Sequence, residues 1–400
     1  MGFTIEDMRL VSEERYKMEF VAGRNGWSNS ISWLLMLEDL TIIQHFTGKE
    51  LAVTTGLGFQ TEEEMLRLVE ELSRHSASGL IFNTGFYVME IPASVLAFCD
   101  ENDLPLLLVP WEISVSDMIK DLSIRVFLQT QTDEQISNAL IHAIETPEGE
   151  DLYMRDLLPH FDLDGSFQVA LITADGLDSM DTVERKRLAY RIQLYITNIT
   201  HNGHFFYYAS CFVLVMNAMT EEEAAEIMDS FAKRAATKFT DVRISIGVSD
   251  IVRDIRSVHT AYKRAEAALK WSRGKGLPIV YFREMGLFRL ISRVEDEDLL
   301  RQMSDEPLAP LLAYDREHGT DFAETLKIYL KCGGSIKSVS EKMFIHRNTI
   351  LYRIGQIREI LGTDLESQGE RVKYLIAFMI REMPAPEGSD PSGAAGASMV

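Results

Sequence analysis

Residues 333–362, with the sequence GGSIKSVSEKMFIHRNTILYRIGQIREILG, constrain the fold of this chain more than any other segment. Ser335 is a good N-cap, so a short helix is expected over residues 336–342. A second helix is expected over residues 347–361, with Gly362 at its C-terminal end. Five apolar residues have the spacing of a buried seam between two crossed helices: Val339, Met343, Ile345, Ile350 and Ile354. The segment therefore predicts two packed helices joined by a tight turn.

The charge of this segment is opposite to that of the chain as a whole. The 400 residues carry a formal net charge of −21, whereas residues 327–358 hold seven basic residues and a single acidic one, Glu341. An acidic surface repels phosphate backbones, so a basic helical stretch is expected where one part of the protein approaches nucleic acid. The charge pattern therefore predicts that the helix pair binds DNA.

The polar side chains near the turn have the chemistry that DNA reading requires. A recognition helix presents its N-terminal residues to base edges, where Arg pairs bidentately with guanine and Asn with adenine. Arg347 and Asn348 are therefore the strongest candidates for reading bases. Basic and hydroxyl residues of the first helix are better placed to hold phosphates, which set register and affinity. The predicted DNA contacts are Ser335, Lys337, Ser338, Lys342, His346, Arg347, Asn348, Thr349, Tyr352 and Arg353.

Other interpretations of the helix pair stay open at this point. It could be an amphipathic hairpin with a solvated basic face, or a scaffold that docks an acidic protein partner. The polar Arg347-Asn348-Thr349 start of the second helix suits base edges better than a protein groove. His346 could touch DNA or equally cap the turn. Phe344 stands in the tight turn, where helix-turn-helix motifs often have Gly.

The same residues resemble a known family. FIHRNTILYRI, preceded by GGSIKSVSEKM, is similar to the C-terminal helix-turn-helix of the PucR/CdaR family of bacterial transcription regulators. The resemblance implies a leading helix over residues 321–332 and a trailing helix over residues 370–383. It also implies an activator or repressor of a catabolic operon, for purines or sugar acids among others, that responds to a small metabolite.

The first 130 residues show alternating strand-like and helical runs. Strands are expected over 31–37, 50–55, 79–83 and 104–109, and helices over 62–75 and 92–102. Such alternation predicts a parallel sheet covered by helices. Thr61 and Glu64 form a capping box that fixes the start of the first helix. GKELAVTTG at 48–56 and LPLLLVPWEISVSDM at 104–118 resemble pieces of the PucR-type ligand-sensing domain.

Polar residues follow the expected strands at their carboxyl ends. Parallel sheets of this class bind ligands in the crevice at that edge. Thr, Asn and Gly at strand ends also make ordinary turns, which is at least as good an explanation for each residue taken singly. As a set, they are the expected effector pocket: Glu38, Thr54, Thr55, Asn83, Thr84 and Trp111.

Residues 113–146 have a largely helical pattern with apolar residues at roughly heptad spacing. Gln129 and Asp133 interrupt that apolar seam. A connecting helix that packs a dimer and a helix that covers the first domain fit the pattern about equally well.

A different unit is expected over residues 165–285. Its order βαββαβαβ is typical of the ferredoxin-like plan, and SIGVSD at 245–250 with AYKRAEAALKWSRGKGLPIVYF at 261–282 resembles the end of a GGDEF cyclase domain. Cyclisation needs carboxylates that hold two metal ions. The hairpin at residues 208–212 reads YASCF and has neither acid nor glycine, and Asp175 is the one carboxylate nearby. We therefore expect a degenerate domain and no enzyme activity.

The sequence as a whole predicts a multidomain protein, with an N-terminal parallel-sheet α/β part, a ferredoxin-like α+β middle part and an all-α C-terminal part. The expected parts are a PucR-like effector-sensing domain over 1–130, a helical linker over 131–164, a degenerate GGDEF-like domain over 165–290, a linker over 291–320, a helix-turn-helix domain over 321–383 and a disordered tail over 384–400.

The expected partners are double-stranded DNA, a small-molecule effector and a second copy of the chain. A single module binds DNA weakly, so a homodimer or higher oligomer is predicted. Cys99, Cys211 and Cys332 are scattered, so neither a disulfide framework nor a metal site is expected, and no cofactor is predicted. No apolar run approaches the ~20 residues of a membrane helix, and we expect a cytoplasmic protein.

Overall fold

Two compact units make up the chain, residues Met1–Leu269 and Lys270–Val400. The computed structural model describes residues 2–196 and 202–384. The predicted tail over 384–400 therefore lies, apart from Pro384, outside the described residues. No helix within the described ranges is long and apolar enough to cross a bilayer. We refer to the two parts as unit 1 and unit 2.

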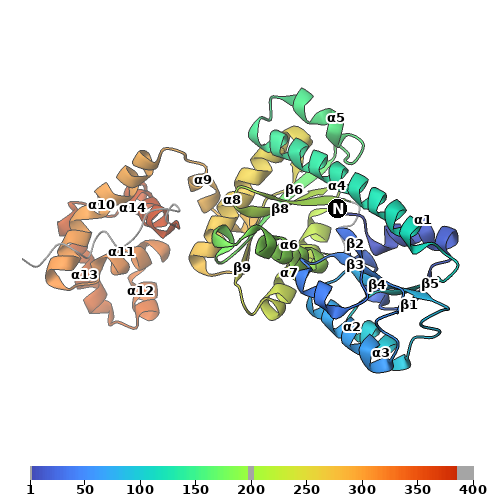
Figure 1. Ribbon diagram of the computed structural model, residues 1–400. Coiled ribbons are helices and arrows are strands. Elements are labelled where there is room, and N and C mark those ends of the chain that lie inside the picture. Colours follow the sequence, from blue (N-terminus) through green and yellow to red (C-terminus); the bar gives the residue numbers. More distant parts are fainter. Residues whose placement is uncertain (1, 197–201, 385–400) are drawn as a thin grey trace, which may run out of the picture. The chain divides into compact units, whose positions relative to one another are not determined.

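The predicted parallel sheet forms the N-terminal part of unit 1 (Figure 1). Four strands, β2 to β5, pair in parallel, and β1 joins β5 antiparallel, so the order is β1-β5-β4-β3-β2. The sequence did not predict β1, because its four residues are too few to show a period. The strands are β1 (Glu19–Ala22), β2 (Trp33–Met36), β3 (Glu50–Thr54), β4 (Gly79–Thr84) and β5 (Leu106–Pro110).

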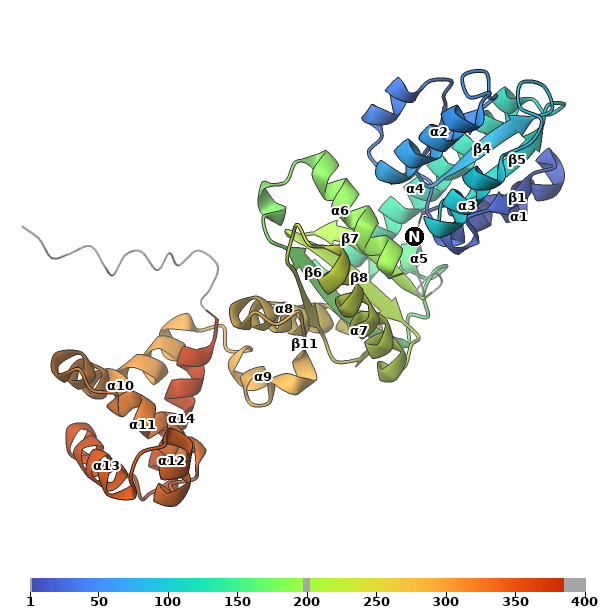
Figure 2. The ribbon, with the colours of Figure 1, turned by 90° about the horizontal axis from the view of Figure 1, so that it is seen from below.

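Helices cover both faces of this sheet (Figure 2). The alternation of β3 residues shows how, because Ala52 packs with α2 and α3, whereas Leu51 and Val53 pack with α1 and α4. The predicted capping box of Thr61 and Glu64 is present at the start of α2. The helices are α1 (Ile5–Tyr16), α2 (Glu62–Arg74), α3 (Ala93–Glu101) and α4 (Val115–Glu145), with short 3-10 turns at Arg24–Ser28 and Leu40–His45.

Helix α4 runs unbroken for 31 residues and belongs to two hydrophobic cores. Its first half packs with α1 and the parallel sheet through Val115, Met118, Leu122 and Val126. Its second half packs with the following sheet through Ile136, Leu140 and Ala143. The helix thus covers the parallel-sheet domain and connects it to the domain that follows.

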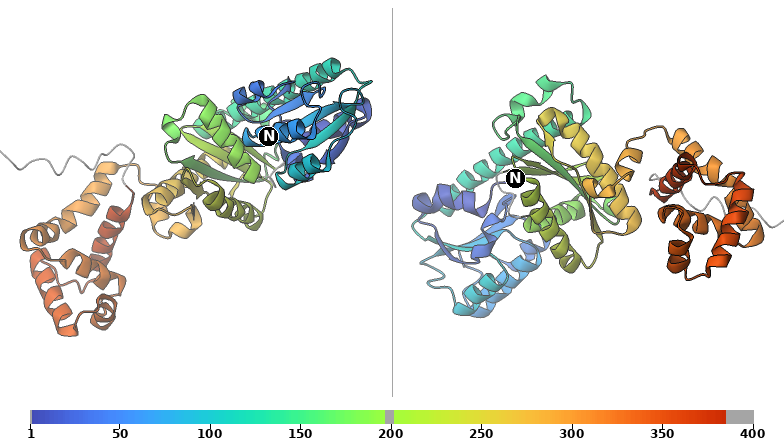
Figure 3. Two further views of the ribbon diagram at one scale, coloured as in Figure 1. Left: turned by 60° about the horizontal axis from the view of Figure 1, so that its bottom comes forward. Right: turned by 180° about the vertical axis from the view of Figure 1, so that it is seen from behind.

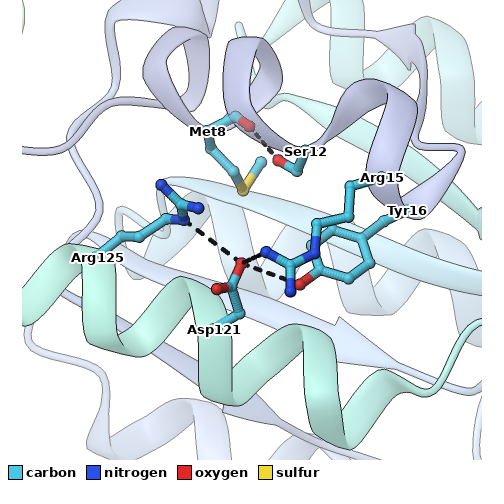
Figure 4. A network of polar contacts seen from close by, with 6 residues as sticks. All are labelled: Met8, Ser12, Arg15, Tyr16, Asp121 and Arg125. Atoms are coloured by element: carbon cyan, nitrogen blue, oxygen red, sulfur yellow. Dashed lines mark hydrogen bonds and ion pairs between the residues drawn. The ribbon is translucent and has the colours of Figure 1, made fainter.

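A polar network fastens α1 to the first half of α4 (Figure 4). The Asp121 carboxylate accepts from the Tyr16 hydroxyl at 2.9 Å and lies 3.2 Å from Arg15 Nη1 and 3.4 Å from Arg125 Nε. Partial burial alone would raise the pKa of Asp121, but these hydrogen bonds and charges lower it overall. Two arginines from different helices thereby share one carboxylate, which links α1 to α4.

The second part of unit 1 is an antiparallel sheet with the order β9-β6-β8-β7, and β10 pairs with the start of β6. The predicted hairpin is confirmed as β7 and β8, which pair from Gly203↔Met216 to Tyr208↔Cys211. The elements are β6 (Ser166–Ala174), β7 (Gly203–Tyr208), β8 (Cys211–Asn217), β9 (Ile244–Val248), β10 (Val252–Arg253), α5 (Met154–Leu157), α6 (Thr182–Tyr195), α7 (Glu221–Lys238) and α8 (Val258–Lys275).

Unit 2 is helical apart from the short β11 (Ile279–Tyr281), and its C-terminal helices pack around one core (Figure 3). The helices are α9 (Phe288–Ile291), α10 (Glu297–His318), α11 (Phe322–Lys331), α12 (Ile336–Met343), α13 (Arg347–Leu361) and α14 (Gln368–Glu382). The leading and trailing helices that the resemblance implies are present as α11 and α14.

Helix α10 occupies most of residues 291–320, which the sequence predicts to be a linker. Pro307 and Pro310 lie inside it, and such residues normally end or kink a helix because they lack an amide donor. Leu308 and Leu311 are nonetheless fully buried in the core of unit 2. Tertiary packing therefore outweighs the local cost of the prolines.

A close approach between β9 and α8 yields the first prediction. A Cβ atom added at Gly247 would lie 2.1 Å from the Leu269 amide nitrogen and 2.4 Å from the Ala265 carbonyl oxygen. We expect Gly247→Ala to lower the free energy of unfolding by about 1–3 kcal/mol, or by more if the backbone cannot shift. Urea denaturation followed by circular dichroism measures the change.

Gly355→Ala is the matched control for this glycine variant. Gly355 is exposed inside α13, and an added Cβ would meet nothing within 4 Å. Because Ala favours a helix over Gly, this variant should gain about 0.5–1 kcal/mol. Equal effects of the two substitutions would mean that β9 and α8 are not in close contact.

Candidate nucleic-acid interface

The two helices of the predicted motif begin where side chains supply their caps. Helix α12 begins after Ser335, whose hydroxyl accepts from the Ser338 amide at 3.3 Å. Helix α13 begins after His346, whose Nδ1 accepts from the Asn348 amide at 3.3 Å. His346 therefore caps the helix, one of the two alternatives for this residue, and its exposed ring is also accessible to DNA, the other alternative. Both helix starts agree with the sequence-based prediction.

The predicted seam holds the helices together. Val339, Ile350 and Ile354 are buried, while Met343 and Ile345 pack against them in part. The Ser340 hydroxyl donates to the Ile345 carbonyl at 2.6 Å, which ties the end of α12 to the turn. The turn is therefore fixed from within by one small polar residue as well as by apolar packing.

Phe344 lies at the tight point of the turn in a left-handed conformation, with φ 55°. A residue with a Cβ pays a steric cost there that Gly does not. Its ring is also 96% exposed, so core packing does not offset this cost. The departure from Gly that the sequence shows is thus a real feature of the turn, and we have no structural account of it.

Most of the predicted DNA contacts lie on the exposed surface of α12 and the start of α13. Arg347, Asn348 and Thr349 form the first turn of α13, and all three are exposed. Tyr352 is exposed one turn later. The side chains on α12 that could hold phosphates are exposed as well, namely Lys337, Ser338 and Lys342. A basic and amide-bearing helix start is therefore exposed on unit 2, while Ile350 and Ile354 of the same helix are buried.

Arg353 is placed differently from the other predicted contacts. Its guanidinium Nη1 lies 2.7 Å from an Asp321 carboxylate oxygen and 3.1 Å from the Thr325 hydroxyl, both at the start of α11. Only about a fifth of the side chain is exposed. Arg353 thus joins α13 to α11, an arrangement that sequence spacing alone does not reveal.

Two further basic residues of the charged segment are also engaged within unit 2. Lys327 and Lys331 lie 3.0 Å and 2.9 Å from the same Glu382 carboxylate oxygen on α14. The hydrogen bond to Glu382 raises the pKa of Lys327. The basic residues of this segment that remain exposed on α12 and at the start of α13 are Lys337, Lys342 and Arg347, of which Lys337 lies 4.0 Å from a Glu341 carboxylate oxygen.

The expected effector residues do lie together at the carboxyl edge of the parallel sheet, but several bond to one another. The Glu38 carboxylate accepts from the Thr54 hydroxyl at 3.0 Å and from the Thr55 amide and hydroxyl at 2.8 and 2.7 Å. The Asn83 amide donates to the carbonyls of Val109 and Pro110 at 3.1 and 3.0 Å. These polar groups therefore hold the strand ends in place, which agrees with the turn-forming alternative for them.

Trp111 belongs to an aromatic cluster at the same edge. Its ring stacks on Phe86 with 4.7 Å between centroids and meets Tyr87 edge-on at 5.6 Å. Phe86 and Trp111 are both exposed. Thr84, at the end of β4, lies two residues before Phe86. We refer to Phe86, Tyr87 and Trp111 as the aromatic cluster. The sequence feature that could have indicated this cluster is the Phe86-Tyr87 pair, which begins two residues after the buried strand β4.

A polar cavity of about 480 Å³ offers a second place for a ligand in unit 1. Its walls include Asn25, Asn29, Asp103, Tyr190 and Arg234. None of these residues was predicted, because they come from four separate segments whose meeting depends on the tertiary fold.

The hairpin that replaces a cyclase signature turns through Ala209 and Ser210, both with positive φ. Tyr208 donates from its hydroxyl to Glu145 on α4 at 2.7 Å, so the hairpin end is used to contact that helix. Within residues 2–196 and 202–384, no group of three or more His, Cys, Asp or Glu side chains is placed to hold a metal ion.

Three family models match successive parts of the chain. Residues 10–126 match the purine catabolism regulatory protein-like family, residues 148–271 match a GGDEF-like domain, and residues 322–380 match the PucR C-terminal helix-turn-helix domain. The matched segments coincide with the parallel sheet, the antiparallel sheet and helices α11 to α14.

Curated relatives match parts of the chain at low identity. The proline-responsive transcriptional activator PutR of Bacillus subtilis is 25% identical over 227 residues, which cover 54% of this chain and 54% of that protein. The purine catabolism regulatory protein of the same organism is 25% identical over 190 residues, 45% of this chain and 35% of that protein. The chain thus aligns with about half or less of the length of these relatives.

One solved structure aligns with more than half of the chain. A regulator of polyketide synthase expression from Bifidobacterium adolescentis aligns with 64% of this chain and 95% of its own, at 15% identity and a TM-score of 0.30.

The contacts of Arg353 yield the second prediction. If its guanidinium mainly joins α13 to α11, Arg353→Ala should lower the free energy of unfolding of unit 2 by about 1.5–3 kcal/mol, the range for hydrogen bonds to charged groups. Thermal and urea unfolding of the full chain measure this change. A variant that unfolds like the wild type but binds nucleic acid more weakly would return Arg353 to the interface.

Proposed function

We propose that this chain, which carries a PucR-type N-terminal domain, a GGDEF-like domain and a PucR C-terminal helix-turn-helix domain, is a sequence-specific DNA-binding transcription regulator. The observation that carries the proposal is the start of α13, where Arg347, Asn348 and Thr349 are exposed while the rest of the helix is anchored in a core. A rigid helix with a free polar N-terminus has the form that enters a major groove.

In this proposal the two helices divide the work of recognition. Arg347 pairs with guanine and Asn348 with adenine, while Thr349 and Tyr352 contact the neighbouring base edges. Ser335, Ser338 and the lysines of α12 hold phosphates, which position the protein without reading sequence. Arg353 keeps α13 in place behind them. The acidic remainder of the chain disfavours any other approach of the protein to DNA.

The proposal requires two copies of the chain on one site. A single helix-turn-helix buries little surface on DNA, and dimers gain affinity by binding two half-sites about one helical turn apart. We therefore propose a homodimer on a repeated or palindromic operator in the cytoplasm.

The regulated process is proposed to be catabolic and to respond to a small metabolite. The names of two relatives support this, since one is a proline-responsive activator and the other a purine catabolism regulatory protein. The effector can change DNA binding only if it favours one arrangement of the paired DNA-binding domains over another. The GGDEF-like domain is assigned no catalytic role, because its hairpin has Ser210 and Cys211 where carboxylates would be needed.

Within this proposal, the effector site is the carboxyl edge of the parallel sheet, now centred on the aromatic cluster and Thr84. Glu38, Thr54 and Thr55 support this edge through their mutual hydrogen bonds, and Asn83 supports it by donating to the Val109 and Pro110 carbonyls. Exposed aromatic faces beside strand ends are suited to stack on a flat ring or to cover an apolar metabolite.

The third prediction concerns the base-reading arginine. On the cognate site, Arg347→Ala should weaken binding by about 1–3 kcal/mol and relax the preference for one base pair. Selection of genomic fragments by the wild type, beside an Arg347→Ala/Asn348→Ala variant, supplies the site. Enrichment of no discrete site, with cell metabolites present, would favour a protein-interaction scaffold.

Lys337→Ala is the matched control for a phosphate contact. It should weaken binding to cognate and random DNA alike and reduce the slope of log affinity against log salt by about one. If Arg347→Ala shows that same uniform loss, Arg347 contacts a phosphate rather than a base.

The fourth prediction locates the effector. A metabolite that binds the folded chain stabilises it by RT ln(1 + [L]/Kd), so the melting temperature rises with the logarithm of ligand concentration. We expect Trp111→Ala, at a tryptophan that is 41% exposed, to abolish this shift and Trp33→Ala, at a tryptophan on β2 that is 52% exposed, to leave it intact. Loss of the shift in Arg234→Ala instead would assign the effector to the 480 Å³ cavity.

A further inference from the structure

Helix α4 carries an exposed apolar ridge midway along its length. Ile124, Phe127 and Leu128 are 52%, 56% and 59% exposed, although the opposite face of the same helix is buried in two cores. Their spacing of three and four residues places them side by side on one face. Three large apolar side chains on such a short stretch are more than the scattered exposure that surfaces normally show.

Charged residues flank the ridge symmetrically. Lys120 lies seven residues before Phe127, and Glu134 lies seven residues after it, and both are exposed. Seven residues are nearly two full turns, with a drift of only about 20°, so the three side chains share one face of α4. Each charge stands about 10 Å along the axis from Phe127.

We infer that this face of α4, from Lys120 to Glu134, pairs antiparallel with the same face of a second copy of the chain. A two-fold axis at Phe127 stacks the apolar ridges on each other. Because the flanking charges are equidistant from Phe127, the same axis sets Lys120 of each copy beside Glu134 of the other. A self-complementary patch of this kind is what a two-fold dimer interface requires.

The charges select the direction of the pair. In a parallel arrangement Lys120 would face Lys120 and Glu134 would face Glu134, and like charges in register repel. Exposed ion pairs add little affinity, so burial of the ridge drives association and the charges fix its orientation. Gln129 and Asp133, which interrupt the heptad pattern, are half-buried and are joined to each other by a 3.1 Å hydrogen bond.

This inference deepens the homodimer of the proposed function by naming its surface. The helix that pairs is the one shared by the N-terminal sheet and the GGDEF-like sheet. A change of packing in the sensing domain would therefore act directly on the dimer contact, with no intervening flexible segment.

The fifth prediction is tested on the full chain without DNA, by sedimentation over a concentration series. We expect the wild type to form dimers and Phe127→Glu to raise the dimer dissociation constant at least tenfold. Leu158→Glu, at an apolar site of unit 1 that is 66% exposed and lies outside α4, should leave the constant unchanged. A wild type that stays monomeric, or a Phe127→Glu variant that dimerises normally, overturns the inference.

Charge variants test the direction and are not expected to disturb folding, because both side chains are exposed. Lys120→Glu and Glu134→Lys should each weaken the dimer several-fold, and the double exchange should restore it. Oxidation of a mixture of Lys120→Cys and Glu134→Cys proteins should cross-link one to the other, with little product from either alone. Cross-linking within each single variant instead would mean a parallel pair and overturn the antiparallel assignment.

Failure of the dimer and failure of DNA binding are distinguishable. Dimers that form through α4 without enriching any genomic site would uphold the interface and refute the regulator. A discrete DNA site bound by a chain that is monomeric in solution would refute the interface and uphold the regulator.

Discussion

Helix α4 joins two hydrophobic cores, and the arrangement of unit 1 depends on that shared burial. Residues such as Met118 and Leu122 complete the core of the parallel sheet, and Leu140 and Ala143 complete that of the antiparallel sheet. Since both ends of one rigid helix are committed, the two sheets cannot separate without exposing apolar surface. The contacts of Asp121 with α1 and of Glu145 with the Tyr208 hairpin add directional polar links at the two ends.

In unit 2, burial serves a different purpose, because it immobilises a helix whose outer surface is left free. Val339, Ile350 and Ile354 anchor the helix pair, and Arg353 joins α13 to α11. The lysines of α11 both pair with Glu382 on α14, and Lys327 also lies 3.6 Å from a Glu324 carboxylate oxygen. The remaining positive charge therefore projects from α12 and the start of α13, against a chain of net charge −21. Recognition chemistry is thus confined to one small surface.

Local patterns in the sequence anticipated most elements and a large part of the candidate interface. Alternation of apolar runs predicted the parallel sheet, and the caps at Thr61, Ser335 and Gly362 fixed helix ends, because these signals act within a few residues. Strand β1 was missed because it is short and pairs with a distant strand. Helix α10 was missed because Pro307 and Pro310 argue locally against a helix that long-range packing stabilises.

The sequence by itself determined which residues carry the chemistry of the helix-turn-helix, since helical periodicity assigns Arg347 and Asn348 to an exposed first turn. Tertiary structure alone decided which of the other polar candidate residues form contacts within the protein. Arg353 finds its acidic partner 32 residues away, and Glu38 is occupied by the threonines of the next strand. Periodicity specifies the side of a helix on which a residue lies, whereas the partner on that side is supplied by whichever distant segment packs there.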